Sequence, residues 1–312
     1  MRAFFLTLLI CFYSVLIAQE TKLPLEIRGS HLFSHWKLND TIDVRVFLET
    51  GFPRIVFSEK FAKEHLRGMV DMVEAPENSF ITLWNNDGQK IKVTYLIKDS
   101  LILNGEKLKI DALVADVKNQ KSWEGRDMVF PLCDLNGRIE LNIKDKYMKI
   151  LGRNELPPAD CFTYDLMFDN RTRGLYMTTT MQIYDAFGGK EELKGNFLLD
   201  LGAGGSFFLN KNRTEVTEFV SRSDRMMLKD TTQFKQNPRT ELSIIMPEQM
   251  KIDNIEIKES FIAAMKITSS NTSDNYVGII GTPFFANFIV IFDFENTKFY
   301  LKPHSDKVKI VE

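Results

Sequence analysis

The sequence predicts an all-β protein with few short helices, built from two similar halves. Most apolar runs have the length of a strand and are rich in Ile, Val, Phe, Thr and Tyr. Turn residues separate these runs at short intervals. The same order of elements also occurs twice along the chain. Short helices are expected only at Ser58–His65 and Pro283–Asn287, after the first and the last glycine turn.

The N-terminus has the pattern of a secretory signal peptide. An apolar segment follows the basic Arg2 and ends at the small residue Ala18, after which the chain becomes polar. We therefore expect residues 1–18 to be removed and the protein to be exported, either to a periplasm or out of the cell. The apolar segment is shorter than a typical transmembrane span, and no later segment approaches that length. A lipoprotein signal at Cys11 is the alternative, although Ile10 stands where a small residue is expected.

Charge and cysteine content limit the classes of partner and of scaffold. The 40 basic and 42 acidic residues give a net charge of −2, which provides no basic footprint for nucleic acid or for an anionic membrane. Cys133 and Cys161 remain after the signal peptide is removed. In an oxidising compartment they could pair or stay as two buried thiols, and the sequence leaves both alternatives open.

A break in the strand pattern divides the chain. The double proline Pro157-Pro158 lies in a segment without strand periodicity. We predict a linker at 153–160 between an N-terminal lobe at 19–152 and a C-terminal lobe at 161–312.

The two predicted lobes repeat one order of elements. In the first, the alternating strand Ile42–Leu48 ends at Glu49-Thr50-Gly51. In the second, the apolar strand Phe197–Leu199 ends at Asp200-Leu201-Gly202. A further short apolar strand follows each of these turns. The match favours two copies of one unit, and the alternative is that strands and turns recur at such spacing in any β-protein.

A second glycine marks each lobe further along the chain. Gly125 follows Gly51 by 74 residues, and Gly281 follows Gly202 by 79 residues. Each of the later glycines precedes a hairpin-like pair of apolar strands. We therefore predict that Gly125 and Gly281 occupy equivalent places in the two lobes.

Asp200 is the strongest candidate for a chemical role. A carboxylate at the end of an apolar strand is costly unless the surrounding backbone donates hydrogen bonds to it. The run from Phe197 to Phe208 resembles the signature of the aspartic proteases, in which an apolar strand delivers an Asp-Thr/Ser-Gly-Ala loop. The run from Val277 to Asp293 resembles the second element of that family, in which an apolar pair and a glycine pass beneath the active loop.

The resemblance implies two pseudo-symmetric acid-protease-like β-barrel lobes with a cleft between them. Each lobe supplies one carboxylate, and these are Asp200 and Glu49. It implies an aspartic endopeptidase that hydrolyses peptide bonds through a carboxylate-activated water, with no cofactor and no metal. The partner would be an extended peptide or an unfolded protein in the cleft. The oligomeric state stays open, a monomer included.

The same resemblance assigns roles to residues around the two carboxylates. The active-site loops contain Thr50, Gly51, Leu201, Gly202, Ala203 and Ser206, with Gly125 and Gly281 in support. Ser206 could bond a carboxylate or stabilise its own turn. The run Leu83–Ile91 is the expected flap over the peptide, with Trp84 and Gly88 in it, and an ordinary exposed hairpin is the alternative.

Several positions depart from the family pattern. Glu49 replaces the first aspartate, and its extra methylene moves the carboxylate by on the order of an ångström. Phe52-Pro53 replaces a small residue, Leu201 replaces a hydroxyl residue, and Glu124 puts a charge where an apolar residue is expected. Two alternatives therefore stay open. One is a catalytically inactive peptide-binding pseudoprotease of the same fold, and the other is a structural envelope β-protein.

A metal site is not expected. His31 and His35 lie four residues apart in a predicted strand, on one face but well separated along it. No third ligand stands near them in the sequence.

Overall fold

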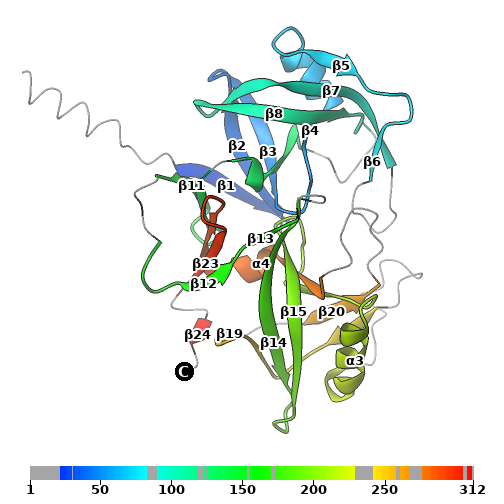
Figure 1. Ribbon diagram of the computed structural model, residues 1–312, viewed down its shortest axis with the longest axis vertical. Helices are drawn as coiled ribbons and strands as arrows, with labels where there is room; N and C mark the ends of the chain where they lie inside the picture. The colour runs from blue at the N-terminus through cyan, green and yellow to red at the C-terminus, as the bar shows by residue number, and fades with distance from the viewer. Residues whose placement is uncertain are drawn as a thin grey trace, which may run out of the picture.

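The computed structural model places two β-rich lobes one above the other along the long axis of the molecule (Figure 1). The structure describes residues 22–29, 31–82, 90–118, 123, 125–135, 137–152, 155, 157–169, 173–228, 242–257, 261–266, 276–304 and 308–310. The predicted signal peptide lies outside these ranges. The prediction of an all-β fold with few short helices is confirmed.

The upper lobe of Figure 1 is formed by the first half of the chain. Its strands are β2 (His31–Leu38), β3 (Ile42–Glu49), β4 (Ile55–Ser58), β5 (Met72–Glu74), β6 (Phe80–Thr82), β7 (Lys90–Leu103), β8 (Glu106–Ala115) and β9 (Met128–Pro131). Its helical turns are α2 (Glu59–Phe61), η1 (Ala62–Leu66) and η3 (Leu132–Asp134).

The lower lobe is formed by the second half. Its strands are β13 (Met167–Phe168), β14 (Leu175–Tyr184), β15 (Lys190–Asp200), β16 (Phe207–Asn210), β17 (Ser243–Ile245), β18 (Gln249–Ile252), β19 (Ile255–Ile257), β20 (Ile262–Met265), β21 (Gly278–Gly281) and β24 (Val308–Ile310). Its helices are α3 (Thr214–Arg222), η4 (Asp224–Met226) and α4 (Thr282–Phe285).

A group of six strands joins the two lobes. It contains β1 (Lys22–Arg28), β10 (Arg138–Asn142), β11 (Tyr147–Leu151), β12 (Phe162–Asp165), β22 (Phe288–Asp293) and β23 (Lys298–Pro303). The closing hairpin β22–β23 pairs with β10, so that Arg138 lies opposite Asp293, and both side chains are buried. The last hairpin of the second half thus completes a sheet begun by the first half. The lobe boundary at 153–160 stays a prediction.

The hairpin that leads to Glu49 follows from its sequence. β2 and β3 pair antiparallel, with Phe33 opposite Phe47. The turn between them uses Asn39 and Asp40 at φ 47° and 62°, a conformation that Asn and Asp tolerate better than most residues. The predicted strand Ile42–Leu48 is confirmed here.

Both lobes contain the same three-strand arrangement, as the repeat predicts. β9 lies between β3 and β4, parallel to the first and antiparallel to the second. β21 lies in the same way between β15 and β16. The register places Glu49 opposite Pro131 and Asp200 opposite Gly281.

The predicted equivalence of Gly125 and Gly281 is therefore wrong. Pro131 holds the place of Gly281, since 82 residues separate it from Glu49 and 81 separate Gly281 from Asp200. Gly125 lies in a turn before β9, with φ +71°. Glycine adopts this left-handed conformation at no steric cost, so Gly125 has a different local reason to be there.

Two of the helical segments lie where the sequence predicts them, and a third lies where no helix was predicted. α2 and η1 fall within the predicted helix at 58–65 or one residue past it, and α4 overlaps the predicted helix at 283–287. α3 was not predicted, although Val216 and Phe219 are buried three residues apart. None of the helices in the described ranges is long and apolar enough to cross a membrane.

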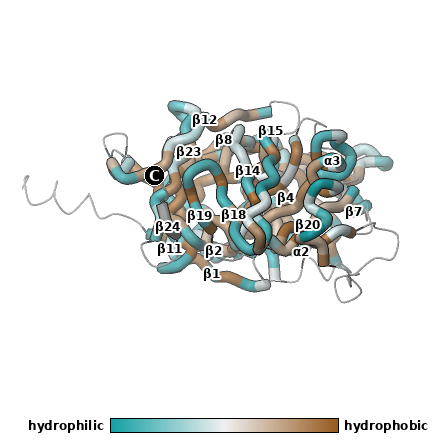
Figure 2. The backbone as a smooth tube through the Cα atoms, turned by 90° about the horizontal axis from the view of Figure 1, so that it is seen from below, coloured by the Kyte–Doolittle hydropathy of each residue, from teal (hydrophilic) through white to brown (hydrophobic). Residues whose placement is uncertain are grey.

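Hydrophobic residues run along the strands through the middle of the molecule, and hydrophilic residues gather on α3 and the outer turns (Figure 2). The largest fully buried side chains are aromatic, and examples are Trp36, Phe130 and Phe284. Cys133 and Cys161 are both free thiols. Burial raises the pKa of Cys161 to about 11, which keeps its thiol protonated and unreactive at neutral pH.

Candidate active site

The two predicted carboxylates are delivered by equivalent strands. Glu49 is the last residue of β3, and Asp200 is the last residue of β15. These strand ends meet in the middle of the molecule, where the lobes join (Figure 1). The loops that follow them, at 50–51 and 201–203, therefore face each other.

Thr50 ties the two loops together. Its hydroxyl donates a hydrogen bond of 2.6 Å to the carbonyl of Leu199. The same oxygen accepts a bond of 3.0 Å from the backbone N–H of Leu201. Thr50 is 0% exposed, so both bonds are shielded from water.

Both of these bonds use a hydroxyl group of the first lobe. Leu201 is fully buried, and its apolar side chain cannot form the reciprocal pair of bonds that a hydroxyl would form. The Leu201 carbonyl accepts a 2.6 Å bond from the Thr282 hydroxyl, which holds this loop within its own lobe. The predicted departure at Leu201 therefore leaves the contact between the loops to the two bonds of Thr50.

Each carboxylate accepts hydrogen bonds from its own loop. Glu49 Oε2 accepts from the N–H groups of Thr50 at 2.8 Å and Gly51 at 3.2 Å. Asp200 Oδ1 accepts from the N–H of Gly202 at 2.8 Å. The longer glutamate side chain thus folds back onto its own loop and takes the place that an aspartate would have.

Two glycines let the carboxylates approach. A β-carbon placed on Gly51 would stand 3.5 Å from Asp200 Cγ. A β-carbon on Gly202 would overlap Oε1 of Glu49. Each glycine therefore packs against the carboxylate of the opposite lobe, and Gly202 leaves no space for a side chain.

The two carboxyl groups lie close enough for their protonation to be coupled, since a β-carbon on Gly202 would overlap Glu49 Oε1 and stand 3.1 Å from Asp200 Oδ1. Burial raises the pKa of Glu49 well above its usual value, and the charge of Asp200 raises it further. Burial also raises the pKa of Asp200, whereas the bonds from Gly202 and Glu49 lower it. The two groups therefore titrate as one coupled pair, which retains a proton to higher pH than an isolated carboxyl group.

The remaining loop residues act mainly through the backbone. Ala203 donates its N–H to the Asp200 carbonyl at 3.1 Å and accepts from Thr282 N–H at 3.1 Å. Ser206 accepts from the N–H of Gly281 at 3.0 Å through its own carbonyl. Gly281 passes so close beneath the loop that a β-carbon on it would overlap the carbonyl of Gly205. Of the predicted flap, Trp84 and Gly88 lie outside the described residues.

Sequence reasoning missed two nitrogen-bearing neighbours of the pair, Arg126 and His31. Arg126 lies near enough to Glu49 for their charges to interact, and burial lowers its pKa to about 10. Burial lowers the pKa of His31, and the charge of Arg126 lowers it further, whereas the nearby carbonyl of Gly202 opposes both effects. His35, the other histidine of the pair considered for a metal, lies instead 3.6 Å from Glu26.

No family model matches the chain, and no curated protein matches it. A solved structure does match, the aspartic proteinase from Irpex lacteus, with a TM-score of 0.55. The match covers 91% of this chain and 97% of that chain, at 8% sequence identity. This chain has the acid-protease fold. The match covers both lobes, so the likeness extends to the two-lobed arrangement, while an identity this low shows the fold alone.

Proposed function

We propose that the protein is an aspartic endopeptidase. The observation that carries the proposal is the close pair of buried carboxyl groups, Glu49 and Asp200, at the junction of the two lobes. Backbone N–H groups hold both carboxylates, and the Thr50 hydroxyl fixes one loop against the other. A fixed pair that shares one proton is what acid–base catalysis of amide hydrolysis needs.

We assign the role of base to Asp200 and the role of acid to Glu49, because the charge of Asp200 adds to burial in raising the pKa of Glu49. Ionised Asp200 accepts a proton from a water molecule, which then attacks the carbonyl carbon of the scissile peptide bond. Protonated Glu49 donates a hydrogen bond to the carbonyl oxygen, and the water adds to give a tetrahedral intermediate. The intermediate collapses when the amine leaves with a proton from the pair. No covalent bond to the enzyme is formed.

The substrate would be an extended peptide or an unfolded protein segment lying between the lobes. The N-terminal sequence pattern supports an exported compartment for this reaction. The inactive peptide-binding protein of the same fold is the alternative outcome of the test below.

The test uses the chain without residues 1–18 and a library of blocked peptides, from pH 3 to pH 8. Wild type is expected to cleave members of the library, and Asp200→Asn and Glu49→Gln are each expected to lose cleavage. Asp253→Asn is the control, because Asp253 is a carboxylate of the same lobe that bonds Thr179 and Thr180 instead of the pair.

A folded wild-type protein that cleaves nothing contradicts the proposal. Retained cleavage in Asp200→Asn contradicts it equally. Peptide binding without cleavage would identify the inactive binding protein.

A further inference from the structure

A cluster of nitrogen-bearing side chains lies beside the carboxyl pair, on the face of the upper lobe that carries Glu49. Side chains alternate along β2 and β3, so His31 and Phe33 share a face with Phe47 and Glu49. The His31 ring meets the Phe47 ring edge-on, with centroids 5.4 Å apart. The Arg126 guanidinium stacks over the same Phe47 ring at 3.9 Å and lies 5.6 Å from the centroid of Phe33.

Within the described ranges, the charge of Arg126 is not neutralised by an ion pair. Among the described residues, no carboxylate lies within 4 Å of its guanidinium, although the acidic pair is near enough to influence it. Its Nε is buried without a hydrogen-bond partner, and so is Nδ1 of His31. Trp123, which packs in the same hydrophobic cluster as Phe33 and Phe47, also has a buried ring N–H without a partner.

Donors left without acceptors indicate what this surface would bind. The arginine side chain and the tryptophan ring can only donate hydrogen bonds. Leaving a buried donor unpaired costs about 1–3 kcal/mol, and an incoming acceptor removes that cost. A carboxylate suits an arginine best, because its two oxygens match the guanidinium and the bonds are charge-assisted.

The other lobe has the same strand arrangement without residues like Arg126 and His31 at the corresponding positions. The two lobes can be aligned on Glu49 and Asp200 through the registers of β9 and β21. The position of Arg126, two residues before Met128, then corresponds to Tyr276, two residues before Gly278.

The position of His31 can be aligned in the same way. The cross-strand pair of Phe33 and Phe47 corresponds to Tyr176 and Leu198. His31, two residues before Phe33, therefore corresponds to Gly174.

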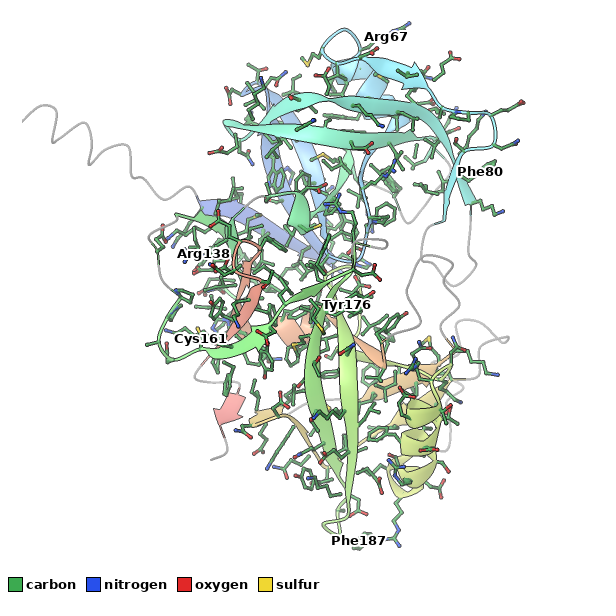
Figure 3. The ribbon with its side chains drawn as sticks, in the orientation of Figure 1. Arg67, Phe80, Arg138, Cys161, Tyr176 and Phe187 are labelled. Carbon is green, nitrogen blue, oxygen red and sulfur yellow. The ribbon has the colours of Figure 1, made fainter. Side chains whose placement is uncertain are left out.

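Tyr276 fills its position by packing. It is 1% exposed, and its ring lies 6.2 Å from that of Tyr176, near the middle of the molecule in Figure 3. An aromatic ring therefore satisfies the packing at this position of the fold. The upper lobe has a partly buried cation in its place, which points to a role in recognition instead of stability.

We propose that Arg126 and His31 form a subsite that selects substrates with an acidic side chain next to the scissile bond. This inference rests on the proposed function, since it names the substrate class of the same site. The occupant is the carboxylate of a glutamate or aspartate in an extended peptide. The carboxyl pair lies beside this subsite and would act on the adjacent peptide bond.

The test compares blocked peptides that differ only in glutamate or glutamine at each residue flanking the cleaved bond. Blocked ends exclude recognition of a terminal carboxylate. At one flanking position, wild type is expected to show a kcat/KM about 10- to 100-fold higher for glutamate, the range typical of a desolvated charge pair. Arg126→Met keeps an unbranched stem over Phe47, and it is expected to bring the glutamate-to-glutamine ratio close to 1.

Arg45→Met is the matched control. Arg45 also stacks on Phe33, at 5.0 Å, but its charge is paired with Glu26 at 2.8 Å. This variant is expected to keep the wild-type ratio. An equal fall for both peptides in Arg126→Met would overturn the inference, because Arg126 would then act on the carboxyl pair. A wild-type ratio near 1 at every flanking position would overturn it too.

A failure of the proposed function gives a different result. If wild type cleaves no peptide, binding of the same peptides is measured by fluorescence anisotropy. Tighter binding of the glutamate peptide that disappears in Arg126→Met would uphold the subsite without catalysis. Equal binding of both peptides, or no binding, would refute the subsite as well.

Discussion

The Thr50 hydroxyl makes the most specific structural prediction. Thr50→Val replaces the hydroxyl by a methyl group of similar size, so no cavity forms, but both bonds across the lobe junction are lost. The N–H of Leu201 then becomes a buried donor without a partner, which costs about 1–3 kcal/mol. The lost bond to the Leu199 carbonyl adds about 1 kcal/mol. We therefore expect the free energy of unfolding to fall by about 2–4 kcal/mol.

The measurement is unfolding in urea, followed by tryptophan fluorescence and by circular dichroism, in the chain without residues 1–18. Thr217→Val is the matched control, because the Thr217 hydroxyl bonds the Lys211 and Arg213 carbonyls at 3.2 Å on the exposed side of α3. That control should change stability by less than about 0.5 kcal/mol. An equally small change in Thr50→Val would refute the assignment of Thr50 as the tie between the loops.

Three further predictions concern the carboxyl pair. Because Glu49 has a raised pKa in the folded protein, its contribution to stability is complete below about pH 4.5 and is lost as the pH rises through the raised pKa. Glu49→Gln should therefore gain stability relative to wild type as the pH rises above about 4.5, and a constant difference across pH in urea unfolding would refute this. Gly202→Ala should abolish peptide cleavage, because the new methyl overlaps Glu49 Oε1; unchanged kcat/KM would contradict the packing. Glu49→Asp should lower kcat by about 100-fold, because the shorter side chain withdraws the carboxyl group by on the order of an ångström, and a higher kcat would show that the site is not adapted to glutamate.

Much of the fold and part of the candidate site could be predicted from local sequence. The loop at Asp200 combines an apolar strand, a carboxylate and small residues in one short run, and each of these features acts on its immediate neighbours. The repeat of that pattern at Glu49 gave the second loop. The sequence of α3 also contains a local signal for a helix, since Val216 and Phe219 lie at helical spacing.

The wrong prediction that Gly125 lies beneath the loop of Glu49 has a physical cause. Glycine was used as the marker of the strand beneath each loop, and Gly125 was the glycine at a suitable distance. The structure uses register and not residue type, because β9 needs only to run parallel to β3 and end opposite Glu49. A proline argues against a position in a central strand, so Pro131 carried no visible signal.

Arg126 and His31 could not be found from sequence for a related reason. Arg126 lies 77 residues from Glu49 in the chain, and only the parallel pairing of β3 and β9 brings it near the carboxyl pair. His31 approaches through the hairpin register, which a one-residue shift would turn to the opposite face. Contacts of this kind depend on pairing across the sheet, and no short motif encodes them.

The two lobes share a topology but place different chemistry around it. In a symmetric pair of carboxyl groups, a shared proton would lie equally on either group. Here Glu49 lies in the lobe with Thr50 and Arg126, whereas Asp200 lies in the lobe with the apolar Leu201 and Tyr276. Burial raises the pKa of both groups, but the charge of Asp200 raises that of Glu49 further, whereas the bond from Glu49 lowers that of Asp200. The departures from the family pattern thus surround the two carboxyl groups with different neighbours, so the pair is not symmetric.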